Sequence, residues 1–220
     1  NQTTKIMMAQ YHNIIWDWNG TLLNDLDLSL KIANGMLANH QTYMLDLATY
    51  QNAFGFPITA YYEKIGIDLS KESFEVLTDR FVTNYNAGLL DCQLHDGALT
   101  ILQEWQKQQK KQYILTAAHL DLVTPLLNKF DIEHFFEHVE GVDNFKAEGK
   151  AARGVRMLQE QQIKPAETVL IGDTYHDYEV ANTMGVACIL VANGHQSKER
   201  LVDFTQGTTK VIGSLKELWS

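Results

Sequence analysis

The sequence predicts a doubly wound α/β fold, in which helices cover both faces of a parallel sheet and a helical domain is inserted after the first strand. Short apolar runs alternate with amphipathic patterns between residues 93 and 191, and a further apolar run lies at residues 14–16. Between them, residues 24–90 show helical periodicity alone. Strands that alternate with helices imply right-handed crossovers and therefore a parallel sheet.

The first predicted strand, residues 14–16, ends at Asp17 and is followed by the turn-forming residues Asn19, Gly20 and Thr21. A buried strand of a parallel sheet has this apolar character. It would place Asp17 at the carboxyl edge of the sheet, where open α/β sheets bind their ligands. The alternative is a β-hairpin, because Asn-Gly is a strong hairpin signal. This stretch alone supports both interpretations equally.

Residues 24–90 are predicted to form an all-helical domain, whereas residues 1–23 and 91–220 form the Rossmann-like α/β domain. Apolar residues recur at three- and four-residue steps from 28 to 40 and from 74 to 89, which is the pattern of amphipathic helices. Pro57 is expected to open a short helix between them. The aromatic residues in these patterns are expected to belong to the core rather than to a ligand site.

The second half of the chain supplies the remaining strands. They are predicted at residues 112–117, 138–142, 168–172 and 186–191, with helices between them. Pro125 is expected near the first turn of its helix, because a proline deeper inside would interrupt the hydrogen bonds. Gly185 is expected to end the helix before the last strand in a left-handed conformation.

The composition argues against nucleic acid and membrane as partners. The 220 residues carry a formal net charge of −9 and no cluster of Lys or Arg, whereas nucleic-acid binding needs a basic face. No apolar run approaches the roughly 18 residues of a membrane span, and the first ten residues are too weakly apolar for a signal peptide. Cys92 and Cys188 lie among apolar neighbours and are expected to be free thiols. We therefore expect a cytoplasmic protein, whose oligomeric state the sequence does not indicate.

Polar side chains follow the predicted strands at the points where they end. Asp17 follows the first strand, Thr116 lies at the end of the second, and Asp173 follows the strand at 168–172. In a parallel sheet these ends share one edge. Asp173 and Asp177 beside Asp17 would bind a hard cation, and Mg²⁺ fits a phosphate site. Asp177 has a second interpretation, because the spacing Thr174-x-x-Asp177 predicts a capping box for the next helix.

Lys150 is predicted to open a helix, where its ammonium group and the helix amides could both face an anion. The ordinary alternative is a solvated surface lysine. Lys146, one helical turn earlier, is the competing candidate for an anion-binding lysine.

Taken in chain order, four motifs resemble those of the haloacid dehalogenase-like hydrolase superfamily, and most of all its phosphoglycolate phosphatase-like branch. They are DWNGTL at 17–22, ILT at 114–116, Lys150, and GDTxxD at 172–177. The resemblance covers essentially the whole chain, including a helical cap inserted after the first motif. Lys150 matches the family lysine better than Lys146, because it stands immediately before the helix.

The resemblance implies a phosphatase mechanism for a small phosphorylated metabolite. Asp17 would attack phosphorus and form an aspartyl-phosphate. Thr116, Ala117 and Lys150 would bind the phosphoryl oxygens. The Mg²⁺ ligands that the family implies are the Asp17 carboxylate, the Asn19 backbone carbonyl, Asp173 and Asp177.

Asn19 departs from the family pattern. In the phosphatases this position is normally an aspartate that protonates the leaving group and later deprotonates the attacking water, whereas an amide cannot exchange a proton at neutral pH. Three accounts follow. In the first, the protein is a phosphatase that is slow or that recruits His176 or His195 for proton transfer. In the second, it performs another family reaction, such as phosphonate cleavage with Lys31 as the Schiff-base lysine. In the third, it binds a phosphorylated ligand without turnover.

Overall fold

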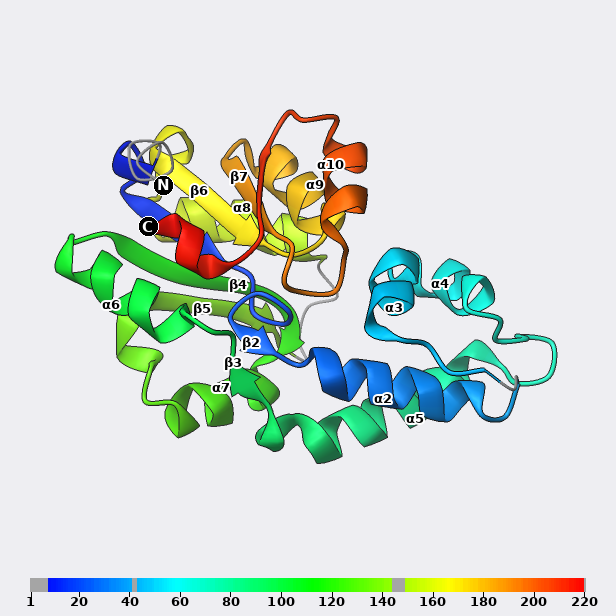
Figure 1. The fold of residues 1–220 in the computed structure, drawn as a ribbon. Coiled ribbons are helices and arrows are strands. Elements are labelled where there is room, and N and C mark those ends of the chain that lie inside the picture. The colour runs from blue at the N-terminus through cyan, green and yellow to red at the C-terminus, as the bar shows by residue number, and fades with distance from the viewer. Residues whose placement is uncertain (1–7, 41–42, 144–148, 220) are drawn as a thin grey trace.

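The computed structural model describes residues 8–40, 43–143 and 149–219. Within them, six parallel strands form one sheet in the order β5-β4-β1-β6-β7-β8. Figure 1 shows this sheet with helices on both sides. The strands are β1 (Asn13–Trp16), β4 (Lys111–His119), β5 (Phe136–Val142), β6 (Thr168–Gly172), β7 (Ala187–Val191) and β8 (Lys210–Ile212). The predicted doubly wound α/β fold is confirmed.

Two pairs of helices cover the sheet. Helices α6 (Ala98–Lys107) and α7 (Leu120–Lys129) pack on one face, while α8 (Lys150–Glu160) and α9 (Tyr175–Met184) pack on the other. Helix α10 (Lys198–Thr205) contacts α9 and the edge strand β8. Short 3₁₀ turns complete the described elements: η1 (Leu89–Asp91), η2 (Glu133–Phe135), η3 (Pro165–Glu167) and η4 (Leu215–Leu218).

The alternation of side chains along β1 divides the core into two layers. Ile14 and Trp16 pack with α6 and α7, whereas Ile15 points to the other face and packs with α8 and α9. The Trp16 ring stacks on Trp105 with centroids 5.1 Å apart. Its indole Nε1–H donates to Gln112 Oε1 at 3.1 Å, so the one polar atom of this fully buried ring has a partner. This packing fixes the strand that ends at Asp17.

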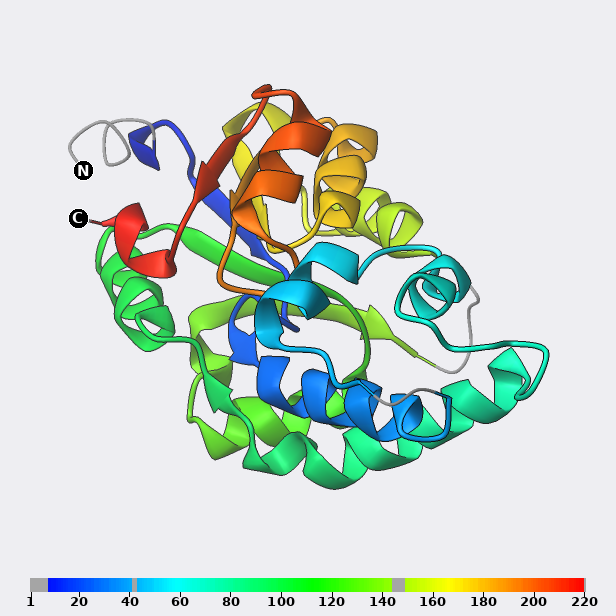
Figure 2. The same ribbon diagram turned by 45° about the vertical axis from the view of Figure 1, so that its right-hand side comes forward.

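Four α-helices lie within residues 24–90, and Figure 2 shows them beside the end of the sheet at which β1 terminates. They are α2 (Leu26–Leu37), α3 (Leu47–Ala53), α4 (Ile58–Lys64) and α5 (Phe74–Gly88). Their buried side chains form a hydrophobic cluster of their own. Strands β2 (Leu23–Asn24) and β3 (Gln93–Leu94) pair antiparallel where the chain enters and leaves this segment. We call residues 24–90 the helical insert. Its status as a separate cap domain stays a prediction.

The structure differs from the prediction in local features. Strands β2, β3 and β8 have two or three residues, too few to produce a periodic pattern. Pro125 lies in the second turn of α7 rather than in the first, because the helix already begins at Leu120. The prediction for Pro125 was therefore wrong. Gly185 does end α9 with φ 70°, and Cys92 and Cys188 are free thiols.

In the described part of the chain, no helix combines the length and the apolar character that crossing a bilayer requires.

Candidate active site

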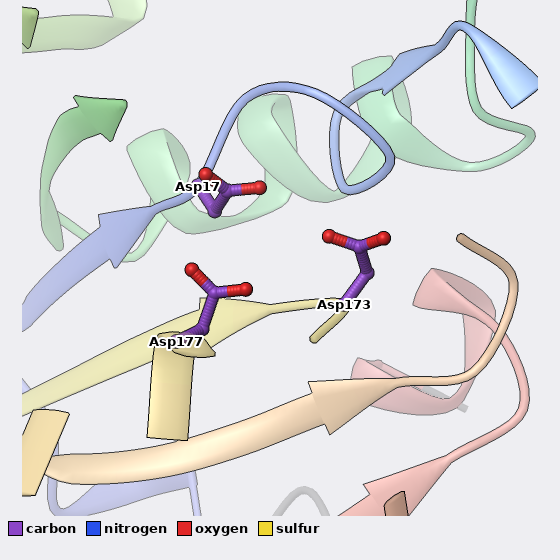
Figure 3. A group of neighbouring side chains, drawn as sticks. All are labelled: Asp17, Asp173 and Asp177. Atoms are coloured by element: carbon purple, nitrogen blue, oxygen red, sulfur yellow. The ribbon is translucent and has the colours of Figure 1, made fainter. Parts of the chain in front are cut away.

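Three buried carboxylates converge at the carboxyl edge of the sheet (Figure 3). Asp17 follows β1, Asp173 follows the neighbouring strand β6, and Asp177 lies in the first turn of α9. One oxygen from each lies within 4.8 Å of the others. The chain crosses from one side of β1 to the other between β5 and β6, so the cluster stands at a switch point of the sheet topology. The β-hairpin alternative for residues 14–21 was wrong, since β1 pairs parallel with β4 and β6.

Lys150 is the cation of this cluster. It is the first residue of α8, as predicted, and it is 7% exposed, so the interpretation as a solvated surface lysine was wrong. Its Nζ donates to Asp17 Oδ1 at 2.5 Å and to Asp177 Oδ1 at 2.6 Å. The other oxygen of Asp177 accepts from the backbone N–H and the hydroxyl of Thr174, which completes the predicted capping box. Asp177 thus caps α9 and orients Lys150 at the same time.

Glycines allow the backbone to approach the carboxylates. A Cβ atom on Gly20 or on Gly194 would overlap the Asp173 carboxylate. Gly20 also has φ 77°, a conformation that other residues rarely adopt. Its neighbour Thr21 donates its hydroxyl to Asp17 Oδ2 at 3.1 Å and lies 3.3 Å from Asp173 Oδ1. The Gly-Thr turn of the first motif therefore holds both carboxylates in place.

The cluster carries more negative than positive charge. Burial raises the pKa of Asp17 to about 6, although Lys150 opposes the shift. Burial, together with the charges of Asp17 and Asp177, raises the pKa of Asp173 to about 8. Burial also acts on Asp177, but the Lys150 ammonium outweighs it and lowers the pKa of that carboxyl. The single ammonium group of Lys150 thus does not neutralise all three carboxylates, and a further cation would compensate the remaining negative charge.

The residues present fit a divalent metal ion. Three buried carboxylates that converge without enough positive charge form the donor set that Mg²⁺ prefers. Asp173 is the best placed of the three to hold it, because Lys150 bonds to Asp17 and Asp177 but not to Asp173. The Asp173 carboxylate is oriented by the backbone N–H of His195, which donates to its Oδ2 at 2.6 Å.

The carboxylates and Lys150 lie in one pocket of about 410 Å³ between the sheet edge and the helical insert. Thr116 and Ala117 line the same pocket, as predicted for phosphate-binding residues. Thr116 is fully buried within β4, which continues to His119, and its Oγ1 accepts from the Ala118 N–H at 3.0 Å. The structure therefore brings together every predicted site residue: Asp17, Asn19, Thr116, Ala117, Lys150, Asp173 and Asp177.

The family model of haloacid dehalogenase-like hydrolases matches residues 14–191, which span these motifs. The chain belongs to the haloacid dehalogenase-like hydrolases. A 5'-nucleotidase from Pseudomonas aeruginosa is 24% identical over 196 residues, covering 87% of this chain and 87% of the relative. A phosphoglycolate phosphatase from Pseudomonas savastanoi is 21% identical, covering 93% of this chain and 77% of the relative. The predicted family is confirmed.

Solved structures show the same fold. A haloacid dehalogenase-like family hydrolase from Streptococcus pneumoniae superposes with a TM-score of 0.76 at 23% identity, covering 96% of this chain and 98% of that one.

Asn19, the position at which the sequence is predicted to depart from the family pattern, has a side chain that belongs to a polar network. The amide nitrogen donates to the Tyr85 hydroxyl at 2.6 Å and lies 3.3 Å from Asp25 Oδ2. Tyr85 in turn donates to the same Asp25 oxygen at 2.5 Å. Asp25 precedes α2 and Tyr85 lies in α5, so the network joins the motif loop to the helical insert.

His195, one of the two histidines that a phosphatase lacking the usual aspartate could recruit, extends the network. Its ring is buried, with Nε2 at 3.0 Å from Asp25 Oδ1 and Nδ1 at 2.9 Å from the Tyr50 hydroxyl. Burial would lower the pKa of His195, but Asp25 outweighs it and raises that pKa to about 9. Burial acts in the opposite sense on Asp25, and His195 lowers the pKa of that carboxyl. The two groups form a buried ion pair at neutral pH.

Sequence reasoning missed Asp25, Tyr50 and Tyr85 as residues of the site. Tyr85 was assigned to the core because it falls on an amphipathic stripe, and it does pack there, but its hydroxyl turns toward Asn19. Asp25 carried one signal, since it lies close behind the Gly-Thr turn of the first motif. Tyr50 had none, because its partner His195 is 145 residues away in the chain.

The remaining candidates are Lys31, His176 and Lys146. Lys31 is exposed on α2 and lines a different pocket, so its predicted role as a Schiff-base lysine has no geometric support. His176 lines the active-site pocket, but its ring is half-exposed and lies 3.5 Å from Glu179. Lys146 falls outside the described residues.

Proposed function

We propose that the protein is a Mg²⁺-dependent phosphatase that hydrolyses a small phosphate monoester through an aspartyl-phosphate on Asp17. The observation that carries the proposal is the contact between Asp17 and Lys150 inside a cluster of buried carboxylates. A nucleophilic carboxylate, a phosphate-binding cation and a metal-binding donor set are the three groups that phosphoryl transfer requires. The relatives named as a 5'-nucleotidase and a phosphoglycolate phosphatase both carry names of phosphate-releasing enzymes.

In the first step a carboxylate oxygen of Asp17 forms a bond to phosphorus while the bond from phosphorus to the ester oxygen breaks. Thr116 and Lys150 bind the phosphoryl oxygens, and the Ala117 backbone lies beside them in the pocket. Asp17, Asp173 and Asp177, with the backbone carbonyl of Asn19, would hold Mg²⁺, which when bound supplies positive charge beside the phosphoryl group. In the second step water cleaves the aspartyl-phosphate, releasing inorganic phosphate and restoring Asp17.

Proton transfer is the weak point of this sequence of steps. The leaving oxygen needs a proton and the attacking water must lose one, yet the Asn19 amide can do neither at neutral pH. General acid–base catalysis contributes about 10²–10⁴-fold. We therefore expect alkyl phosphates to be slow substrates, whereas aryl and acyl phosphates, whose leaving groups need no proton, react faster. Of the two histidines considered as substitutes, both line the pocket, but the two ring nitrogens of His195 are already engaged by Asp25 and Tyr50, whereas the His176 ring is half-exposed.

The test is a panel of phosphate esters assayed with and without Mg²⁺, using the wild-type protein and Asp17→Asn. We expect phosphate release that requires Mg²⁺ and is abolished by Asp17→Asn. Brief incubation with radiolabelled acetyl phosphate should leave label on the wild-type protein only. A folded protein that releases no phosphate from any ester would refute the proposal.

A second candidate function is the binding of a phosphorylated ligand without turnover, and the amide at position 19 is the observation that favours it. Phosphate plus Mg²⁺ should then raise the melting temperature through preferential binding to the folded state. A melting shift without phosphate release from the panel would support this second function.

A further inference from the structure

The active-site pocket extends well beyond the carboxylate cluster, and its outer part is mainly apolar. At about 410 Å³ it has the size of a site for a ligand much larger than phosphate. Its outer wall combines side chains from the helical insert with Leu122 of α7 and His176 of α9. The insert contributes the aromatic rings of Tyr50, Phe54, Phe56, Phe81 and Tyr85.

Among the described residues, no Lys or Arg side chain lines this outer part, whose basic side chains are the histidines His119, His176 and His195. Of the described residues that line the pocket, Lys150 is the one Lys or Arg, and it bonds to Asp17 and Asp177 at the phosphate end. His195 uses both ring nitrogens, one on Asp25 and one on Tyr50. A carboxylate on the leaving group would lose its water without gaining a partner of opposite charge, which is costly.

Two large apolar side chains of the outer wall remain open to solvent. Phe56 is 44% exposed and Val82 is 47% exposed, although both line the pocket. The Phe56 ring lies 5.7 Å from Phe54 and 5.3 Å from His176, so it is held in a cluster of flat rings. Such a cluster offers faces and edges on which another planar ring packs well.

The backbone around Phe56 is anchored to the α/β domain. The Tyr175 hydroxyl accepts from the Phe56 N–H and donates to the Phe56 carbonyl, both at 2.6 Å. Arg200 Nη1 donates to the carbonyl oxygens of Gln51 and Phe54. The exposed Phe56 side chain is therefore a positioned wall of the pocket rather than the tip of a loose loop.

We propose that the leaving group of the substrate is uncharged and carries a planar ring that packs against Phe56 and Val82. This inference rests on the proposed phosphatase function and names its substrate class. Two sources supply such a leaving group, a nucleoside and a simple arylalkyl alcohol, and they share an uncharged planar ring attached to an alkyl oxygen.

The test compares esters whose leaving oxygens are all alkyl, so that a missing proton donor affects them alike. The set is 2-phenylethyl phosphate, uridine 5'-monophosphate, butyl phosphate and phosphoglycolate, each with Mg²⁺. We expect kcat/KM for at least one ring-bearing ester to exceed those for butyl phosphate and phosphoglycolate by about tenfold or more, the scale on which apolar pockets discriminate. A preference for the nucleotide over the phenylethyl ester identifies a nucleoside as the source, and the reverse identifies an arylalkyl alcohol.

Two variants test the role of the wall. Phe56→Ala removes the ring but none of the backbone contacts with Tyr175, and it should reduce the ratio of kcat/KM between ring-bearing and ringless esters towards one. Phe74→Ala is the matched control, because Phe74 is 38% exposed on the same insert but does not line the pocket. Val82→Lys would supply the missing cation and should raise kcat/KM for phosphoglycolate by about tenfold.

Melting shifts with the same esters, recorded with Asp17→Asn so that nothing is consumed, give a reading that does not depend on turnover. The inference is overturned if phosphoglycolate or butyl phosphate binds or reacts as well as the ring-bearing esters, even when the protein is an active phosphatase. Absence of phosphate release from every ester contradicts the proposed function instead. In that case a larger melting shift with ring-bearing esters still supports the inference, and equal shifts overturn it.

Discussion

Placing an aspartate at position 19 is the sharpest test of the proposed mechanism. Asn19→Asp introduces a carboxyl group two residues after the proposed nucleophile Asp17, at the position where the family resemblance predicts a proton donor. If the missing proton transfer limits turnover, the variant should hydrolyse glycerol phosphate faster by up to about 10²–10⁴-fold. Hydrolysis of p-nitrophenyl phosphate, whose leaving group needs no proton, should change little. The decisive quantity is the ratio of kcat values for the two substrates.

The structure also predicts the protonation state of the introduced group. The Asn19 amide nitrogen lies 3.3 Å from Asp25 Oδ2. Two unit charges at that distance repel by about 5 kcal/mol at an effective dielectric constant of about 20. His195 keeps Asp25 ionised, so the new carboxyl group takes up the proton and its pKa rises. A raised pKa keeps the acid protonated at higher pH, so the gain on glycerol phosphate should persist into the neutral range.

Two further variants control this experiment. Asn24→Asp adds the same charge at an exposed position outside the pocket, and it should leave the substrate ratio unchanged. Adding Asp25→Asn to the Asn19→Asp variant removes the repulsion and should move the alkaline limit of the glycerol phosphate activity to lower pH. A missing proton donor does not limit turnover if Asn19→Asp folds and binds phosphate with Mg²⁺, yet its substrate ratio equals that of the wild type.

Three other predictions follow from the geometry. Lys150→Met should lower kcat/KM by about 10²–10³-fold. It should also lower the melting temperature, because Asp17 and Asp177 lose their partner. Lys146→Met should change neither quantity, and if it has the same effects as Lys150→Met, Lys150 is not the specific phosphate-binding lysine. The pKa values of Asp17 and Asp173 are raised to about 6 and about 8, so the folded state holds protons that the unfolded state releases. The two carboxyl groups therefore destabilise the folded state increasingly as the pH rises from about 4 to about 8. Mg²⁺ relieves that repulsion, so its stabilising effect on the melting temperature should grow from pH 5 to pH 8, and a shift independent of pH would contradict the assignment of Asp173 to the metal site. Finally, Leu77 is fully buried in the hydrophobic cluster of the helical insert. Leu77→Ala should lower the free energy of unfolding by about 2–5 kcal/mol and speed hydrogen exchange in α2 to α5, while β1 and β6 stay protected. Faster exchange in the helical insert and in the sheet alike would argue against a separate cap domain.

The carboxyl edge of the sheet was predictable because its residues lie next to strong local patterns. Asp17 and Asp173 each follow a short apolar strand, and Lys150 opens an amphipathic helix. In a parallel sheet those positions meet at one edge whatever the loop lengths between them. The edge strand β8 was not predictable on the same grounds, because three residues do not establish a period of two.

The network around Asn19 was not predictable, because it is built from tertiary contacts across the helical insert. Tyr85 lies on a stripe that packs into the core, and periodicity cannot show that its hydroxyl reaches the motif loop. Pro125 shows the same limit for backbone structure. It was expected near the first turn of its helix, yet it lies in the second turn of α7, where Val123, Leu126 and Leu127 pack into the main core.

Asn19 cannot be understood apart from Asp25. The structure contains a buried carboxylate, that of Asp25, about one hydrogen-bond length from the Asn19 amide, and the Tyr85 hydroxyl bonds to both. With aspartates at both positions, two negative charges would meet in a partly buried site, and one would have to take up a proton. The amide removes that conflict and donates a hydrogen bond instead. The departure at position 19 is therefore matched to its surroundings, in which Asp25, Tyr85 and His195 form a connected polar network.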